Sequence, residues 1–274
     1  MGPAHRRPRH SASMEILSFE RFEYKYYVPE SLVEDIRRFV APYLRLDPYC
    51  AKDPSRTYTI TNLYWDTPGM RLYTDHLHGS VDRLKLRIRT YGPGVGGPTC
   101  FFEVKRKVRQ VIVKHRAVVP RDCYEAVLDG DPGVVFEGPT RAHLDSFLGE
   151  LLRYGAQPAF LLRYQREAYE NIFDEDARVT FDRAICYQAA RGIDLRGDDR
   201  GWTYVDGAES MRGVPQPTLV ELKFGSFVPA WMMDLIRTFD LERSRFSKYM
   251  TVATHQLEHP GGGLDDYRRS SLRV

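Results

Sequence analysis

The segment 83–91, RLKLRIRTY, places a basic residue at every second position. Successive side chains of a β-strand point to opposite faces, so a strand here would carry one apolar face and one strongly positive face. The basic residues that share this face are Arg83, Lys85, Arg87 and Arg89. A fold that accommodates this segment must therefore provide surroundings for a concentrated row of positive charge.

The same alternation recurs along the chain. At least five segments with strand-like residues have Arg or Lys at alternate positions, and four of them add a carboxylate on the same face. These carboxylates are Glu23, Glu103, Asp182 and Glu221. A single such strand is most simply explained by a polar face in water, but the recurrence indicates that the charged faces share one environment.

The remaining patterns predict an α+β fold. Further strands are expected at 56–66 and 158–170, and the run 99–113 is expected to be one strand that pairs with 83–91 across a Gly/Pro turn. Apolar residues at helical spacing predict helices, at 29–43, 140–154, 229–239 and 247–257. Because closure removes the edges of a sheet, we expect an antiparallel β-barrel, flanked by helices, whose charged interior forms a tunnel.

This folded domain is predicted to span 18–258, between a flexible basic arm at 1–17 and a flexible tail at 259–274. The start of the chain lacks the apolar run of a signal peptide, and no segment has the length of apolar residues that a membrane span needs. The four cysteines show no CxxC pairing, which favours a reducing compartment. We therefore expect a cytoplasmic protein.

The balance of charge bears on the partners. The chain has 40 Lys and Arg residues against 37 Asp and Glu residues, so a net charge of +3 does not indicate a protein that coats nucleic acid. No nucleic-acid partner is expected. A preference for anions must come from the local rows of cations.

Those rows favour a phosphate-rich ligand. Arg donates two parallel hydrogen bonds to phosphate and Lys supplies a mobile point charge. The carboxylates on the same faces are hard ligands of the kind that Mg²⁺ or Mn²⁺ uses while it bridges phosphate oxygens. The sequence thus predicts that the interior binds a triphosphate or polyphosphate together with a divalent metal ion.

At this point the chain resembles the VTC domain, the catalytic domain of the polyphosphate polymerase of the vacuolar transporter chaperone complex, in the triphosphate tunnel metalloenzyme superfamily. The resemblance covers about residues 19–257. The matching motifs occur in the family's order, and they are RFEYKY, KLRIRTYG, FFEVKRK, YQREAY, RVTFD, VELKF and RFSKY.

The resemblance implies the roles of individual residues. It implies that Glu221 is the chief metal ligand and that Ser247 and Lys248 lie at a helix start, where free N–H groups favour phosphate. Phosphate contacts are implied for Lys25, Arg87, Arg89, Lys105, Lys107, Lys114, Arg166, Arg178 and Lys248. The alternation of charge adds two further phosphate-binding candidates, Lys85 and Lys223.

Two positions depart from related proteins. Tunnel hydrolases carry an ExExK pattern on the first strand, whereas positions 21, 23 and 25 here are Arg, Glu and Lys. A cation thus replaces one metal ligand. In the second departure, Lys107 stands where the VTC pattern has a His.

These features favour transfer of the γ-phosphate of ATP to a growing polyphosphate chain. Attacking water needs a base, usually a carboxylate, whereas a terminal phosphate oxygen is already anionic and needs mainly its charge shielded. Cations outnumber carboxylates on the predicted inner faces. In this interpretation Arg87, Arg89 and Arg166 hold the charge that builds during transfer, while Lys248 and Ser247 position the γ-phosphate or the acceptor end.

Two alternatives remain open. One is a metal-dependent triphosphatase that acts on tripolyphosphate or nucleoside triphosphates, and the other is a protein that binds polyphosphate or nucleotide without catalysis. Independently of the reaction, the simpler interpretation of Glu23 and Glu103 is that they neutralise neighbouring cations. A separate membrane protein that exports the product is a conceivable partner.

Overall fold

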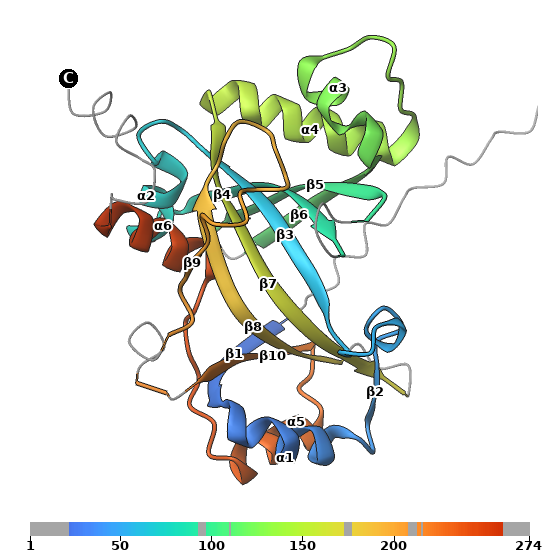
Figure 1. Cartoon of the computed structure of the whole chain (residues 1–274), viewed down its shortest axis with the longest axis vertical. Coiled ribbons are helices and arrows are strands. Elements are labelled where there is room, and N and C mark those ends of the chain that lie inside the picture. The colour runs from blue at the N-terminus through green and yellow to red at the C-terminus, as the bar shows by residue number, and fades with distance from the viewer. Residues whose placement is uncertain are drawn as a thin grey trace, which may run out of the picture.

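The computed structural model describes residues 22–92, 97–109, 111–172, 177–207, 213–214 and 216–259. The predicted arm at 1–17 lies outside these ranges, as does the predicted tail at 259–274 apart from His259. The described residues form a mixed α+β structure in which helices flank one large antiparallel sheet (Figure 1).

The sheet has ten strands among the described residues, and its main path runs β1-β10-β8-β7-β3-β4-β5-β6. Strand β2 pairs with β7 and β9 pairs with β8 outside this path. The strands are β1 (Phe22–Pro29), β2 (Leu44–Leu46), β3 (Tyr58–Asp66), β4 (Asp82–Tyr91), β5 (Thr99–Val108), β6 (Val111–Pro120), β7 (Gln157–Asn171), β8 (Arg178–Ala189), β9 (Thr203–Tyr204) and β10 (Pro217–Phe224).

Six α-helices lie in the described part of the chain. They are α1 (Glu30–Val40), α2 (Arg71–Leu77), α3 (Tyr124–Asp129), α4 (Gly138–Tyr154), α5 (Ala230–Thr238) and α6 (Lys248–Glu258). Helices α1 and α5 lie together at one end of the molecule and α3 and α4 at the other, while α2 and α6 lie together at one side (Figure 1). None of the helices in these ranges has the length and apolar character that a membrane crossing requires.

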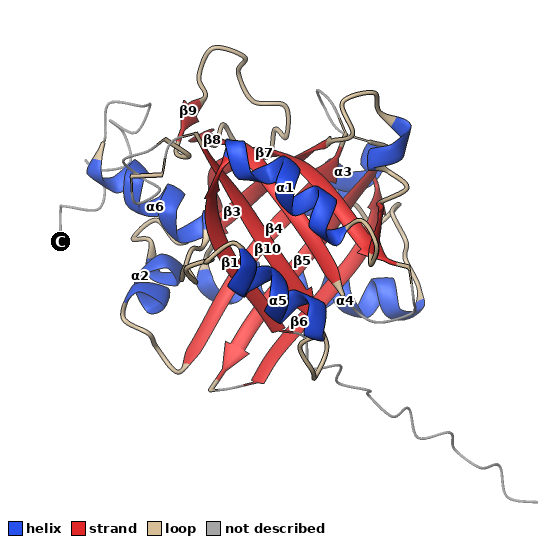
Figure 2. Cartoon of the chain, turned by 90° about the horizontal axis from the view of Figure 1, so that it is seen from below, coloured by secondary structure: helices blue, strands red, loops and turns tan. Residues whose placement is uncertain are grey.

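The apolar faces of the strands point outward, as predicted, and the helices cover them. In β4, Leu84, Leu86 and Ile88 are buried in one core together with Phe102 of β5 and Phe147 of α4. A second core lies on the outer side of β1, β10 and β8, where α1 and α5 lie across the strands (Figure 2). The alternation in the sequence therefore corresponds to a sheet with a helix-covered outer face and a charged inner face.

The sheet is not closed, so the predicted barrel and tunnel are not confirmed. Strand β1 ends the path on one side and β6 on the other. The outer edge of β1 is already occupied, because Tyr26 forms a bridge with Arg243 and the N–H of Ser244 donates to the carbonyl of Lys25 at 2.7 Å. The segment that leads into α6 thus hydrogen-bonds to the free edge of β1. Strand β6 would have to pair with that same edge to close the sheet.

The run 99–113 is two strands, and the prediction of one strand was wrong. The chain turns at Arg109, whose φ of 54° lies in the left-handed region, and β6 then pairs back onto β5. The N–H of Arg109 donates to the carbonyl of Val81 at 2.8 Å, which fixes the turn. Helix α3 and the short strands β2 and β9 were also not predicted, because each is too short to show a periodic pattern.

The outer core provides a test of this packing. Phe147 is fully buried, and its ring centroid lies 5.1 Å from that of Phe102. Phe147→Ala should lower the free energy of unfolding by about 3–5 kcal/mol in urea denaturation, because it leaves a cavity between α4 and the sheet. Leu152→Ala is the matched control on the same helix, since Leu152 is 84% exposed, and it should change the value by at most about 0.5 kcal/mol. Similar losses in both variants would contradict the packing described.

Candidate active site

The buried carboxylate of Glu221, in the middle of β10, gathers cations from several elements. Its Oε1 accepts from Nζ of Lys248 at 2.9 Å, and its Oε2 accepts from Nη2 of Arg166 at 2.9 Å and from Nζ of Lys223 at 2.6 Å. Nζ of Lys25 lies 3.8 Å from Oε1. We call this group the Glu221 cluster, which comprises Lys25, Arg166, Asp182, Glu221, Lys223 and Lys248.

Asp182, the second carboxylate of the Glu221 cluster, is fully buried on β8. Nε and Nη2 of Arg166 donate to its two oxygens, each at 2.6 Å, in the two-pronged geometry that Arg forms with carboxylates. Nζ of Lys248 lies 2.5 Å from Oδ2. Arg166 and Lys248 thus each bridge Asp182 and Glu221.

The cations decide the ionisation of these carboxylates. Burial favours the neutral acid, but Lys223, Lys248 and Arg166 together hold the pKa of Glu221 well below its ordinary value. Burial opposes ionisation of Asp182 in the same way, and Arg166 and Lys248 lower its pKa. Both carboxylates are therefore ionised at neutral pH.

Glu103 on β5 is the centre of a second group. Its Oε2 accepts from Nε of Arg87 at 2.6 Å, and its Oε1 accepts from Nε of Arg116 at 2.7 Å and lies 3.0 Å from Nζ of Lys114. Arg89 lies further away, with Nε 3.9 Å from Oε2. We call this group the Glu103 cluster, which comprises Arg87, Arg89, Glu103, Lys114 and Arg116. Although Glu103 is buried, these cations hold its pKa far below the ordinary value.

Tyr164 on β7 connects the two clusters. Its ring lies below the guanidinium of Arg166, at 5.3 Å, and below Nζ of Lys248, at 4.8 Å. Its hydroxyl accepts from Nη2 of Arg89 at 3.5 Å. The face of the ring attracts the two cations of the Glu221 cluster, and the hydroxyl accepts from Arg89 of the Glu103 cluster, so Tyr164 contacts both clusters.

The beginning of α6 lies between β4 and β10. Ser247 caps the helix by accepting from the N–H of Met250 at 3.4 Å, and Nζ of Lys85 donates to the same Oγ at 2.9 Å. Lys248 follows and reaches the Glu221 cluster. Ser247 and Lys248 therefore bring a helix N-terminus, with its free N–H groups, to the charged inner face.

The inner face is one continuous electrostatic environment even though the sheet is open. Lys25 of β1 repels Lys85 of β4, and Glu23 of β1 attracts Lys105 of β5. These strands are far apart in the order of the sheet. The sheet must therefore curve enough to bring the side chains of its two halves within electrostatic reach.

Most of the predicted site residues come together in this way. Lys85 and Ser247 pair with each other between the clusters, and Lys105 lies near Glu23. Two predicted phosphate ligands lie at the margins, since Lys107 is the penultimate residue of β5 and Arg178, the exposed first residue of β8, faces Lys223 across the ladder. The two clusters contain the predicted residues Lys25, Arg87, Arg89, Lys114, Arg166, Glu221, Lys223 and Lys248.

Several residues of the site were not predicted. Arg116 completes the Glu103 cluster, and Asn62 orients Arg89 by accepting from its Nε at 2.8 Å. The hydroxyl of Tyr64 accepts from Nη1 of Arg87 at 3.0 Å. Asn62 and Tyr64 occupy alternate positions of β3, so the alternation used for the charged strands would have found them if uncharged side chains with hydrogen-bonding groups had been counted.

The donor set fits a metal ion only in a limited way. Among the described residues no three His, Cys, Asp or Glu side chains converge as a chelating group, and both oxygens of Glu221 accept from cations. Mg²⁺, however, is commonly held by one or two carboxylates together with substrate phosphates. Glu221 could therefore hold a metal ion only together with phosphate oxygens, and only with the surrounding lysines displaced from its carboxylate.

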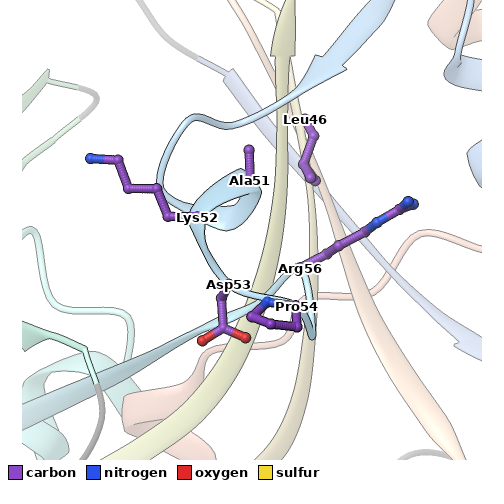
Figure 3. Close-up of a pocket in the computed structure, with 6 residues that line it drawn as sticks. All are labelled: Leu46, Ala51, Lys52, Asp53, Pro54 and Arg56. Atoms are coloured by element: carbon purple, nitrogen blue, oxygen red, sulfur yellow. The ribbon is translucent and has the colours of Figure 1, made fainter.

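A pocket of about 640 Å³ lies on the surface near the connection between β2 and β3. Its lining residues are Leu46, Ala51, Lys52, Asp53, Pro54 and Arg56. Lys52 and Arg56 point away from each other (Figure 3), so they do not form a clamp for one anion. None of the predicted phosphate ligands lines this pocket.

One of the comparisons with known proteins agrees with the motifs. Among solved structures, a chain in "Structure of the Schizosaccharomyces pombe Mediator head module" is similar at 9% identity and a TM-score of 0.37, with 87% of this chain and 94% of that chain covered. That likeness is too weak to support an argument. No curated protein matches the sequence. The model of the VTC domain matches residues 20–255, which is most of the chain, and the protein therefore belongs to the VTC domain family.

Proposed function

We propose that this protein transfers the γ-phosphate of ATP to a growing inorganic polyphosphate chain, with Mn²⁺ or Mg²⁺ as cofactor. Membership of the VTC domain family indicates a function related to polyphosphate. The transfer reaction, the nucleotide and the metal ion are inferred from the site.

The pairing of the carboxylates with cations favours transfer to a phosphate acceptor over hydrolysis. Each carboxylate in the two clusters is bound to at least two cations: Glu221 and Asp182 to Arg166 and Lys248, and Glu103 to Arg87 and Arg116. A carboxylate held ionised by cations is a weak base, so it is poorly suited to take a proton from water. A terminal phosphate oxygen needs no such base, and the surplus of cations suits it as the nucleophile.

The cations of the two clusters would have different roles in the transfer. We assign Arg87, Arg89 and Arg166 to the charge that develops as the phosphoryl group moves, because their guanidinium groups are fixed by Glu103, Asn62 and Asp182 before substrate binds. Lys248 and Ser247 would position the γ-phosphate or the acceptor end at the start of α6. Lys25, Lys85, Lys105, Lys114 and Lys223 would hold the remaining phosphates, with Lys107 and Arg178 at the margins.

Glu221 would hold the divalent metal ion. When bound, Mn²⁺ or Mg²⁺ supplies positive charge to phosphate oxygens and orients them. Glu23 and Asp182, which interact electrostatically with Glu221, would keep the local charge balanced.

We also propose that the protein acts in the cytoplasm, together with a separate membrane protein that exports the product. All four cysteines are free thiols, in keeping with a reducing compartment.

The reaction can be tested by incubating the purified protein with ATP and Mn²⁺ or Mg²⁺, resolving polyphosphate on a gel and measuring free phosphate. We expect a ladder of chains. Glu221→Gln and Lys248→Ala should each lower kcat by about 100- to 1,000-fold, since each removes a preorganised charge from the site. Lys52→Ala, a change of an exposed lysine in the surface pocket, is the matched control and should retain the activity of the unmodified protein.

The products separate the alternatives. Free phosphate without chains would identify a triphosphatase and overturn the proposed transfer. If tripolyphosphate binds but neither product forms, the protein is a binding protein. Activity of Glu221→Gln close to that of the unmodified protein would contradict the metal assignment.

Lys85 should make anion binding depend on pH. Burial, together with the neighbouring cations Lys105, Lys25, Arg87 and Arg83, lowers the pKa of Lys85 to about 7. A bound tripolyphosphate would raise that pKa, so binding at about pH 8 should take up a proton. The contribution of Lys85 to affinity should therefore increase as the pH falls towards about 7 and level off below it.

Calorimetric titration with tripolyphosphate, in buffers of different ionisation enthalpy, measures this uptake. Lys85→Arg keeps the positive charge but does not titrate in this range, so binding of tripolyphosphate to this variant should take up fewer protons than binding to the unmodified protein. The protonation of tripolyphosphate itself is common to both proteins and cancels in the comparison. Equal uptake by both would show that Lys85 is already charged in the free protein.

A further inference from the structure

The carboxylate of Asp66 is fully buried at the end of β3, outside both clusters. It accepts hydrogen bonds from the backbone N–H groups of Thr67 at 2.7 Å, Leu72 at 2.8 Å and Tyr73 at 3.0 Å. Leu72 and Tyr73 belong to the first turn of α2, which has no side-chain cap at Met70. Asp66 thus holds the corner between β3 and α2 by satisfying donors that the helix leaves free.

The same carboxylate reaches α6. The hydroxyl of Tyr249 donates to Oδ2 of Asp66 at 2.6 Å. The ring of Tyr249 is 2% exposed and packs against the rings of Tyr64 and Phe160, with centroids 5.2 and 5.8 Å away. Tyr249 is therefore fixed both along its ring and at its hydroxyl.

Tyr249 directly follows Ser247 and Lys248 in the chain. Lys85 lies between them in space, since its Nζ is 2.9 Å from Oγ of Ser247 and 5.0 Å from the centre of the Tyr249 ring. Successive residues of a helix point about 100° apart in a fixed relation, so a rotation of the first turn of α6 would move the side chains of Ser247, Lys248 and Tyr249 together. The orientation of Tyr249 consequently sets where Lys248 points.

We propose that Asp66 and Tyr249 are positioning residues of the phosphate site, whose mutual hydrogen bond fixes the first turn of α6 so that Ser247 and Lys248 face bound phosphate. This inference rests on the proposed phosphate chemistry of the same surface. It assigns the buried β3–α2 corner a part in activity, although neither residue belongs to the two clusters.

A second hydrogen bond supplies a matched control. The hydroxyl of Tyr73 in α2 pairs with Oγ1 of Thr254 in α6 at 2.9 Å. It joins α6 directly to α2, next to the β3–α2 corner that Asp66 holds, through another buried tyrosine, but it does so more than a turn beyond Lys248. A bond that merely attaches α6 to this corner of the structure would matter equally at either tyrosine.

The test compares Tyr249→Phe with Tyr73→Phe. Each variant keeps its ring and loses one hydroxyl, so we expect similar, modest decreases in Tm. Tyr249→Phe should lower the kcat/KM of chain synthesis by about 10- to 100-fold, because a small displacement of Lys248 misaligns the transfer. Its Kd for tripolyphosphate, measured by calorimetry, should rise several-fold, whereas Tyr73→Phe should leave both quantities within about twofold of the unmodified protein.

Asp66→Asn provides a second variant. Its amide has one accepting oxygen in place of two and cannot accept from the N–H of Leu72 and from Tyr249 at once, so we expect the same loss of affinity as in Tyr249→Phe, and no further loss when the two changes are combined. If Asp66→Asn does not fold, the two tyrosine variants still decide the matter, because both retain the buried ring.

The outcomes distinguish this inference from the proposed function. Equal tripolyphosphate affinities in Tyr249→Phe and Tyr73→Phe, with loss of Tm alone, would overturn the positioning role. If the unmodified protein binds tripolyphosphate without making chains, the proposed transfer fails, and the affinities of the variants still test the positioning. An unmodified protein that does not bind tripolyphosphate would overturn both.

Discussion

The structure depends on compensating a dense group of positive charges on the inner face of a curved sheet. Desolvated cations repel one another, and taking them out of water costs several kcal/mol per ion unless they are paired. Glu221, Asp182 and Glu103 provide this pairing, each with hydrogen bonds or ion pairs to more than one cation. A core of apolar residues would often be at least as stable as such ion pairs, so their presence is better explained by what the cations bind than by stability.

The outer face makes this arrangement possible. Leu84, Leu86 and Ile88 alternate with the cations of β4 and pack under α4, so each strand contributes to an apolar core and to the charged face at once. The cores under α1, α4 and α5 supply much of the free energy of burial, while the inner face combines the charged clusters with a third apolar core that includes Tyr64 and Tyr164 and packs against Tyr249 of α6. This division explains why the covering helices carry few of the residues in the two clusters, with Lys248 at the start of α6 as the exception.

Much of this arrangement could be predicted from the sequence, because charged residues recur at every second position of the strands. The parity of charge at 83–91 placed Arg87 and Arg89 on the inner face, and the same parity placed Glu221 and Asp182 beside cations. That the sheet stays open could not be predicted. The edge of β1 pairs with the segment around Arg243 and Ser244, and the sequence of that segment has no strand pattern. Asp66 was overlooked for a related reason: a lone carboxylate after a strand resembles an ordinary turn residue until the helix that it caps is placed beside it.

The two clusters differ in how far apart their members lie along the chain. The Glu103 cluster is assembled from residues 87–116, on neighbouring strands joined by short turns, whereas the Glu221 cluster needs residues from 25 to 248. Contacts that are local in sequence form sooner than distant ones, and a chain is synthesised from its N-terminus at roughly 5–20 residues per second. On the ribosome, the Glu103 cluster can therefore form while β10 and α6 are still unmade. For that interval Lys25 has neither Glu221 nor the carbonyl of Phe246 beside it, and the complete anion-binding surface exists only once the last fifth of the chain has emerged.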